Sequence, residues 1–84
     1  MIKKEITIML ENGLHARPSA ELVKGLKAFS SSVEIIDGTK HYNAKSILNM
    51  MTSSIREGAI VNIIVDGPDE ETTMEWLASF LQRE

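Results

Sequence analysis

The sequence predicts an α+β fold in which helices cover one face of a small β-sheet. Three observations support this prediction. The length of 84 residues suits one domain, taken as residues 1–84. Strand-like segments, with alternating or β-branched apolar residues, are interspersed along the chain with segments whose apolar residues recur at helical spacing. The resulting order is β-α-β-β-α-β-α, and a layer of helices on one face is the natural cover for such a sheet. The pattern leaves the order of the strands open.

The first strand is indicated by alternating side chains between residues 2 and 10. Apolar residues gather on one parity and polar residues on the other, as expected for a strand with one buried face. The apolar positions are Ile2, Ile6, Ile8 and Leu10, and the polar positions are Lys3, Glu5 and Thr7. Met9 is apolar but falls on the polar face, so the alternation weakens at the end of this segment.

A helix is predicted after the turn sequence Glu11-Asn12-Gly13. Proline is tolerated in the first turn of a helix, where its missing N–H is not needed. Pro18 therefore places the start of the helix at about His15 or Ala16. The apolar face of this helix consists of Leu22, Val23, Leu26 and Phe29, and its outer face carries Glu21, Lys24 and Lys27.

The middle of the chain predicts a hairpin followed by a short helix. Residues 30–32 end the first helix, and residues 33–36 form a strand. Asp37-Gly38 is a typical hairpin turn, after which residues 39–42 return as the second strand. Ser46 is a suitable N-cap for a helix that contains residues 47–51. His41 is expected on the surface of the second hairpin strand, with no functional role.

The last part of the chain predicts one strand and one helix. Residues 59–65 form a nearly continuous β-branched run, which is the strongest strand signal in the sequence. Asp69 is expected to cap the last helix, with Glu70 and Glu71 in the first turn, where the helix dipole favours acids. One face of this helix carries Met74, Leu77, Ala78 and Leu81. Trp76 and Phe80 lie four residues apart and are expected to pack together.

The composition excludes several classes of function. The net charge is −3, which gives no overall basic character for binding nucleic acid. The chain has no cysteine, so disulfides and thiolate metal sites are excluded, and its two histidines show no metal-ligand spacing. No apolar run approaches the roughly 20 residues that span a bilayer, and the first residues lack the apolar core of a signal peptide. We therefore expect a soluble cytoplasmic protein, without membrane insertion and without a cofactor.

The residues with the clearest chemistry surround His15. An imidazole is a nucleophile near neutral pH, because its reference pKa is about 6.5. A helix N-terminus offers free N–H groups and partial positive charge to a phosphate, and the guanidinium of Arg17 matches phosphate geometry. The segment from Gly13 to Pro18 thus suits a phosphoryl group carried on histidine. The alternative is that His15 merely caps the helix while Arg17 is solvated.

Two segments of the chain resemble the HPr family of phosphocarriers. Gly13-Leu14-His15-Ala16-Arg17-Pro18 is similar to the family's phosphohistidine motif, and Asn43-Ala44-Lys45-Ser46-Ile47-Leu48 with Met51 is similar to its regulatory serine segment. Gly67-Pro68-Asp69-Glu70 resembles the family's entry to the last helix. Length and element order also agree, so the resemblance covers essentially the whole chain. It implies an open-faced β-sandwich, with four antiparallel strands and three helices on one side.

The resemblance also implies a function and its partners. Enzyme I would transfer a phosphoryl group from phosphoenolpyruvate to Nδ1 of His15, Arg17 would steady it, and a sugar-specific enzyme IIA would receive it. The residues expected to contact these partners are Ala16, Ala20, Lys24, Lys27, Ile47, Leu48 and Met51. The alternatives are that the apolar members fill the core, which is expected for some of them, and that the lysines form an ordinary solvated face.

Ser46 has two interpretations. It is a helix cap on its sequence context alone, and most serines at such positions do nothing else. By resemblance it is the target of HPr kinase/phosphorylase, and the Ser-phosphorylated form would bind a catabolite-control transcription factor. A phosphate adds roughly −1.5 to −2 charge, so its main effect would fall on a docking surface.

Three departures from the family's usual pattern keep a second function open. Ser19 stands where the family commonly has alanine, and Asn49 and residues 52–54 replace glycine-containing patterns beside Ser46. The divergent residues 49–54 motivate a regulatory adaptor that acts through Ser46 without a transport role. A self-sufficient enzyme is disfavoured, because the chain shows no catalytic triad, glycine-rich phosphate loop or metal set. The protein is expected to be a monomer that does not bind nucleic acid directly.

Overall fold

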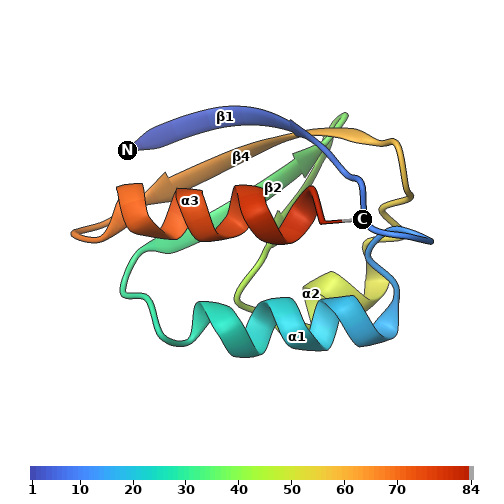
Figure 1. Ribbon diagram of the computed structural model, residues 1–84, viewed down its shortest axis with the longest axis horizontal. Coiled ribbons are helices and arrows are strands. Elements are labelled where there is room, and N and C mark those ends of the chain that lie inside the picture. The colour runs from blue at the N-terminus through green and yellow to red at the C-terminus, as the bar shows by residue number, and fades with distance from the viewer. Residues whose placement is uncertain (84) are drawn as a thin grey trace.

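The computed structural model describes residues 1–83 of the 84-residue chain. In this part of the chain, four strands and three helices follow one another in the predicted order. The strands are β1 (Ile2–Thr7), β2 (Ser32–Asp37), β3 (Lys40–Asn43) and β4 (Ile60–Asp66), and the helices are α1 (Ala16–Leu26), α2 (Ile47–Thr52) and α3 (Glu70–Leu81). All three helices lie on the same side of the sheet (Figure 1). The predicted α+β, open-faced β-sandwich is therefore confirmed.

The strands form one antiparallel sheet in the order β1-β4-β2-β3, which the sequence pattern left open. β4 lies between β1 and β2, with Ile6 opposite Val61 on one side and Ile35 opposite Ile63 on the other. Val61, Ile63 and Val65 are all buried against the helices. A β-branched strand packs well in this central position, because both of its edges are paired and one face is covered.

The predicted alternation of the first segment is confirmed, although β1 itself is shorter than that segment. Ile6, Ile8 and Leu10 are buried, and Met9 is 39% exposed. Strand pairing ends at Thr7, yet the N–H of Ile8 still donates to Ala59 O at 2.8 Å, and Ile8 O accepts from the N–H of Gly58 at 2.7 Å. The chain thus remains attached to the sheet until it turns toward α1.

Helix α1 begins where Pro18 predicts, directly after His15, but it ends at Leu26, before Phe29. Phe29 follows in a turn, in which its N–H donates to Leu26 O at 3.1 Å. Its ring lies 5.9 Å from that of Trp76, and Trp76 stacks on Phe80 with 5.2 Å between ring centroids. The expected packing of Trp76 and Phe80 is confirmed, and it holds α3 against the end of α1.

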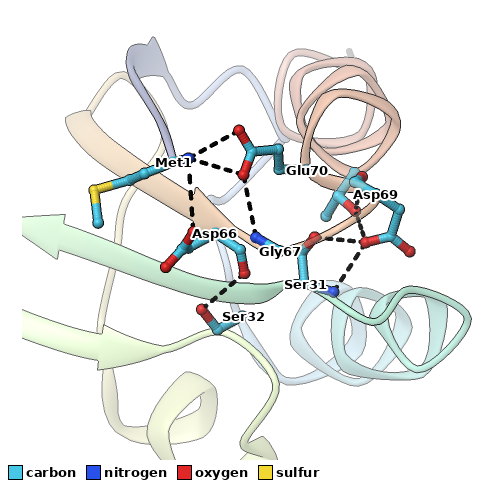
Figure 2. A network of polar contacts seen from close by, with 8 residues as sticks. Met1, Ser31, Ser32, Asp66, Gly67, Asp69 and Glu70 are labelled. Atoms are coloured by element: carbon cyan, nitrogen blue, oxygen red, sulfur yellow. Dashed lines mark hydrogen bonds and ion pairs between the residues drawn. The ribbon is translucent and has the colours of Figure 1, made fainter.

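The capping role predicted for Asp69 is wrong in one respect. Asp69 does occupy the N-cap position of α3, but in the described chain its carboxylate caps no N–H of that helix. It accepts instead from the backbone N–H of Ser30 at 2.8 Å. It also accepts from the backbone N–H of Ser31 at 2.9 Å and from the Ser31 hydroxyl (Figure 2). These hydrogen bonds, led by the Ser31 hydroxyl, lower the pKa of Asp69 to about 2. Asp69 therefore joins the start of α3 to the loop between α1 and β2.

Glu70 forms a second set of polar contacts at the same end of the molecule (Figure 2). Its carboxylate accepts from the α-amino group of Met1 at 2.8 and 2.9 Å and from the N–H of Gly67 at 3.2 Å. The hydrogen bond from Met1 is the main cause of a lowered pKa of Glu70. The expected acidic first turn is confirmed, and it also holds the start of β1.

Two further expectations concern membrane-spanning helices and metal-binding sites. Among residues 1–83, no helix combines the length and the apolar character needed to cross a membrane. Within the same range, no three histidine or carboxylate side chains come close enough together to hold a metal ion.

Candidate functional site: the N-terminus of α1

His15 occupies the N-cap position of α1 with an extended backbone, at φ −79° and ψ −172°. Its carbonyl oxygen accepts from the N–H of Ser19 at 3.0 Å, which closes the first turn of the helix. The imidazole is exposed, and within residues 1–83 it caps no N–H of α1. The hypothesis that the side chain of His15 serves as a helix cap is therefore wrong. The exposed imidazole lies beside the positive end of the helix dipole.

The loop before His15 is held by backbone contacts with the segment that follows α2. Gly13 has φ +72°, and a Cβ at this position would lie 2.4 Å from Ile55 O. The N–H of Leu14 donates to the same Ile55 O at 2.9 Å, and the side chain of Leu14 is buried. Glycine is needed here both for the positive φ and for the close approach of two backbones. These contacts fix where α1 begins and hence where the imidazole stands.

Ser19 replaces the alanine expected at its position, and the structure gives it a role. Its side chain is fully buried, and its hydroxyl lies 3.0 Å from Leu14 O and 3.4 Å from Met50 O. The hydroxyl is thus satisfied by backbone oxygens of the loop before α1 and of α2. This departure from the family pattern is compatible with the site, because it adds a link between the helices that carry His15 and Ser46.

Two shallow depressions flank His15. The first has a volume of about 370 Å³ and includes Arg17, as predicted, together with Glu21 and Arg83. The second has a volume of about 250 Å³ and includes Ser54 and Arg56. Asn12 borders both depressions. The site therefore combines an exposed imidazole with guanidinium groups on two sides, which is a suitable environment for a phosphoryl group.

Arg56 and Arg83 are site residues that sequence reasoning missed. Arg83 lies 62 positions from Glu21, yet its Nη2 atom is 3.2 Å from Glu21 Oε2. Its guanidinium carbon also lies 4.6 Å from the centroid of the Phe80 ring. No local motif marks either arginine, and only the fold brings them to His15.

Ser46 caps α2, as predicted. Its Oγ accepts from the backbone N–H of Asn49 at 3.3 Å and from Asn49 Nδ2 at 3.2 Å. Asn49 Oδ1 accepts in turn from the N–H of Asn43 at 3.1 Å. The departure at Asn49 therefore has a structural consequence, since its side chain joins the serine to the end of β3. Ser46 itself is half-buried.

The apolar residues beside Ser46 face solvent. Ile47, Leu48 and Met51 are 43%, 75% and 53% exposed, whereas Met50 is buried. The alternative that these three residues fill the core is wrong. On α1 and at its C-cap, the predicted partner-binding residues are exposed as well: Ala16, Ala20, Lys24 and Lys27. α1 packs on α2, so both helices present these residues on adjoining surfaces, and their role in binding stays a prediction.

His41 is on the surface, as expected. One of its features was not visible in the sequence: His41 Nδ1 lies 3.0 Å from Glu34 Oε2 on the neighbouring strand. No carboxylate stands next to His41 in the sequence. Glu34 comes close to it only through the pairing of β2 with β3. The pair is exposed and has no third ligand-type side chain nearby in the described chain.

Comparisons with known proteins show the family of the chain. Residues 2–83 match the family model of the "PTS HPr component phosphorylation site". The phosphocarrier protein HPr of Haemophilus influenzae is 40% identical over 81 residues, covering 96% of this chain and 95% of that protein.

Two solved structures extend the comparison. The crystal structure of a phosphocarrier protein HPr from Bacillus anthracis superposes with a TM-score of 0.92 at 36% identity, covering 96% of each chain. Crh, a catabolite repression protein of Bacillus subtilis solved as a domain-swapped dimer, superposes with a TM-score of 0.79 at 36% identity, covering 100% of this chain and 97% of that one. On its matched length, its fold and the site at His15, the chain belongs to the HPr family of phosphocarrier proteins.

Proposed function

We propose that this protein accepts a phosphoryl group on Nδ1 of His15 from phosphorylated enzyme I and passes it to a sugar-specific enzyme IIA. The observation that carries the proposal is the exposed imidazole of His15 at the N-terminus of α1, in one depression with Arg17. Membership in the HPr family supports it. Residues 1–84 would act as one domain in the cytoplasm.

The transfer requires little catalytic machinery from this chain. The lone pair of Nδ1 attacks the phosphorus atom, a new P–N bond forms, and the bond between phosphorus and enzyme I breaks. Arg17 and the first N–H groups of α1 neutralise charge on the phosphoryl oxygens. The reverse sequence of bonds delivers the group to enzyme IIA. In this proposal the protein is a stoichiometric carrier rather than a catalyst, and an exposed site suits it because two different partners must reach the same nitrogen.

The partner-binding surface proposed for this exchange joins α1 and α2. Leu48 and Met51 offer apolar contacts, and Lys24 and Lys27 offer positive charge to acidic partner surfaces. All of them are exposed in the structure, which docking requires. Ala16 and Ala20 are small residues that let a partner approach the helix beside His15.

The decisive experiment is a phosphotransfer assay with enzyme I and phosphoenolpyruvate, comparing the wild-type protein with His15→Ala and His41→Ala. We expect wild type and His41→Ala to gain one phosphate by intact mass, as an acid-labile label, and His15→Ala to gain none. Addition of enzyme IIA should discharge the label. An unlabelled wild-type protein, folded by circular dichroism and mixed with active enzyme I, would contradict the proposal.

Ser46 is proposed as the regulatory residue of this carrier. Phosphorylation by an HPr kinase/phosphorylase would place an anion beside Leu48 and Met51, at the surface used by enzyme I. The modified form would bind a catabolite-control transcription factor. Incubation with such a kinase and ATP should give an acid-stable label that Ser46→Ala lacks, and the labelled protein should be a poorer acceptor from enzyme I.

The second candidate function is a regulatory adaptor without a transport role. The similarity to Crh at 36% identity favours it. It predicts labelling of Ser46 by the kinase and negligible transfer from enzyme I to His15. The same two assays therefore separate the carrier from the adaptor.

We also propose that the protein acts as a monomer. β1 pairs with β4 of the same chain along its whole length, from Ile2 opposite Val65 to Thr7 opposite Ile60. A molecular mass near 9.3 kDa by light scattering would support this, and twice that mass would indicate an exchange of elements between two copies, as in Crh.

A further inference from the structure

Arg83 is brought to the phosphoacceptor site by the fold alone. It follows α3, whose end lies beside the loop that joins β1 to α1 (Figure 1). The N–H of Met9 donates to Leu81 O at 2.8 Å and fixes this arrangement. As a result, Arg83 shares a depression of about 370 Å³ with His15 and Arg17.

In the unphosphorylated protein, the guanidinium of Arg83 is paired with Glu21 at 3.2 Å. The side chains of Arg83 and Glu21 are 52% and 49% exposed, so water screens the pair and the contact is weak. The guanidinium also lies over the ring of Phe80, at 4.6 Å from its centroid. Phe80 is buried and stacked on Trp76, so it offers a firm platform for the guanidinium. Arg83 is thus held near His15 by one rigid contact and one exchangeable contact.

Among residues 1–83, the charged side chains that line this depression are balanced before phosphorylation. Glu11 and Glu21 contribute two carboxylates, and Arg17 and Arg83 contribute two guanidinium groups. A phosphoryl group on His15 adds roughly −1.5 to −2 charge near neutral pH. The negative charge in the depression then exceeds the positive charge of the two guanidinium groups. A phosphate competes well with a solvent-screened carboxylate for an arginine.

We propose that Arg83 is a second phosphate-binding residue, which exchanges the Glu21 carboxylate for phosphoryl oxygens when His15 is phosphorylated. This inference rests on the proposed phosphocarrier function and adds a residue to its site. Arg17 and Arg83 would then hold the group from two directions, one from α1 and one from the end of α3. Glu21 would act as the competitor that returns Arg83 to its resting position after the group has left.

The depression on the other side of His15 provides a comparison. It contains Arg56 without a second arginine. Because a group placed on that side would lack the contribution of Arg17, Arg83 is expected to have the larger influence on the phosphoryl group. Arg56→Ala is therefore the natural comparator for Arg83→Ala.

The test is a ³¹P NMR titration of the phosphorylated protein, with the half-life of the phosphohistidine measured alongside. A nearby cation favours the phosphate dianion, so Arg83→Ala should raise the second pKa of the phosphate by roughly 0.3–1 unit and shorten the half-life severalfold. Arg83→Lys should restore part of both effects, and Glu21→Gln should lower the phosphate pKa. Lys40→Ala, which removes one positive charge at an edge strand, should leave both values at the wild-type level.

Several outcomes would overturn the proposal. Arg83→Ala could match Lys40→Ala in both measurements, or Arg56→Ala could have the larger effect. If Glu21→Gln lowered the phosphate pKa by the same amount with and without Arg83, the two residues would not compete, and the exchange would be refuted. Circular dichroism of each variant separates these outcomes from unfolding.

Failure of the proposed function is distinguishable from failure of this inference. If enzyme I labels no variant, potassium phosphoramidate can phosphorylate His15 chemically in a His41→Gln background: the P–N bond to ammonia breaks, ammonia leaves, and a P–N bond to the imidazole forms. The titration then tests Arg83 without any partner protein. Normal labelling by enzyme I with an unshifted titration in Arg83→Ala would reject only the role of Arg83.

Discussion

Gly13 is the residue on which the placement of His15 depends most directly. Its positive φ of 72° turns the chain into α1, and its missing side chain lets the backbone pass Ile55 O. An added Cβ would meet that oxygen at 2.4 Å and the backbone of Arg56 at 2.7 Å. Backbone atoms of a packed segment cannot yield as a flexible side chain does. The position therefore combines a conformational requirement with a steric one.

We predict that Gly13→Ala lowers the free energy of unfolding by about 2–4 kcal/mol, and that Gly38→Ala lowers it by about 1 kcal/mol. Gly38 is the matched control: its φ is +65°, but an added Cβ would meet nothing within 4 Å. The difference between the two variants measures the clash with Ile55 and Arg56. Urea denaturation followed by circular dichroism gives both values. Equal losses in the two variants would show that the loop before His15 adapts freely.

The functional residues fall into two groups: those that lie close together in the sequence and could be predicted from it, and those that only the fold brings together. His15 and Arg17 were predicted because both belong to one helix start, where nucleophile, dipole and cation follow from local geometry. Arg83 and its partner Glu21 are separated by most of the chain, and their contact depends on where α3 ends relative to α1. Ser54, which borders the second depression, has a φ of +54° that its residue type does not predict. Local patterns thus predicted the chemistry of the site but not its surroundings.

Among the elements, α3 shows how tertiary contacts override a local preference. An aspartate before two glutamates is typical of a helix N-cap, and Asp69 does stand at that position. Its carboxylate nevertheless turns to Ser30 and Ser31, which offer two N–H groups and a hydroxyl from one loop. The sequence could not predict this choice, because the serines lie 38 and 39 positions away. The result is a link between two loops rather than a cap.

We predict that Asp69 makes the stability of the protein depend on pH under acidic conditions. The pKa of Asp69 is about 2 in the folded protein and 3.8 when unperturbed. Its contribution is therefore complete above pH 3.8 and is lost as the pH falls toward 2. Asp69→Asn should be less stable than wild type at neutral pH, and its urea midpoint should fall less steeply between these two pH values.

Glu71→Gln is the matched control for this prediction, because it removes an exposed carboxylate from the same first turn of α3. We expect a much smaller change in its urea midpoint at neutral pH. Urea titrations of the three proteins from pH 7 to pH 2 measure both effects. Parallel acid profiles for wild type and Asp69→Asn would show that the bonds to Ser30 and Ser31 do not contribute to stability.

At the scale of the whole molecule, the fold separates two faces. The helical face carries His15, Ser46 and the exposed apolar residues of α2, while the opposite face of the sheet is left uncovered (Figure 1). The element order and the one-sided cover were predictable, because periodicity distinguishes strands from helices. The strand order was not, since antiparallel pairing of β4 between β1 and β2 involves residues more than 20 positions apart. Strand order comes from packing the whole chain.

We predict that Leu48→Ala weakens phosphotransfer from enzyme I without loss of stability. Leu48 is 75% exposed, so its truncation removes little from the core, whereas a central interface residue contributes about 1–2 kcal/mol to binding. The expected loss in kcat/KM is roughly 5- to 30-fold. The measurement is the initial rate of His15 labelling at low protein concentration, with the urea midpoint determined in parallel.

Ile60→Ala is the matched control, because Ile60 is a large apolar residue, 60% exposed, on the uncovered face of the sheet. Its labelling rate should equal that of wild type. A loss of rate in Ile60→Ala, or none in Leu48→Ala, would place the partner-binding surface elsewhere.

The central position of β4 has a consequence for the folding of the protein during its synthesis on the ribosome. β1 and β2 never pair with each other; both pair with residues 60–66. The helix that carries His15 is complete after residue 26, yet the sheet beneath it lacks its middle strand until residue 66 has emerged. A nascent chain therefore exposes the apolar side of α1 through most of translation. Folding to the phosphoacceptor state is expected to occur late and in one step, rather than progressively as the chain grows.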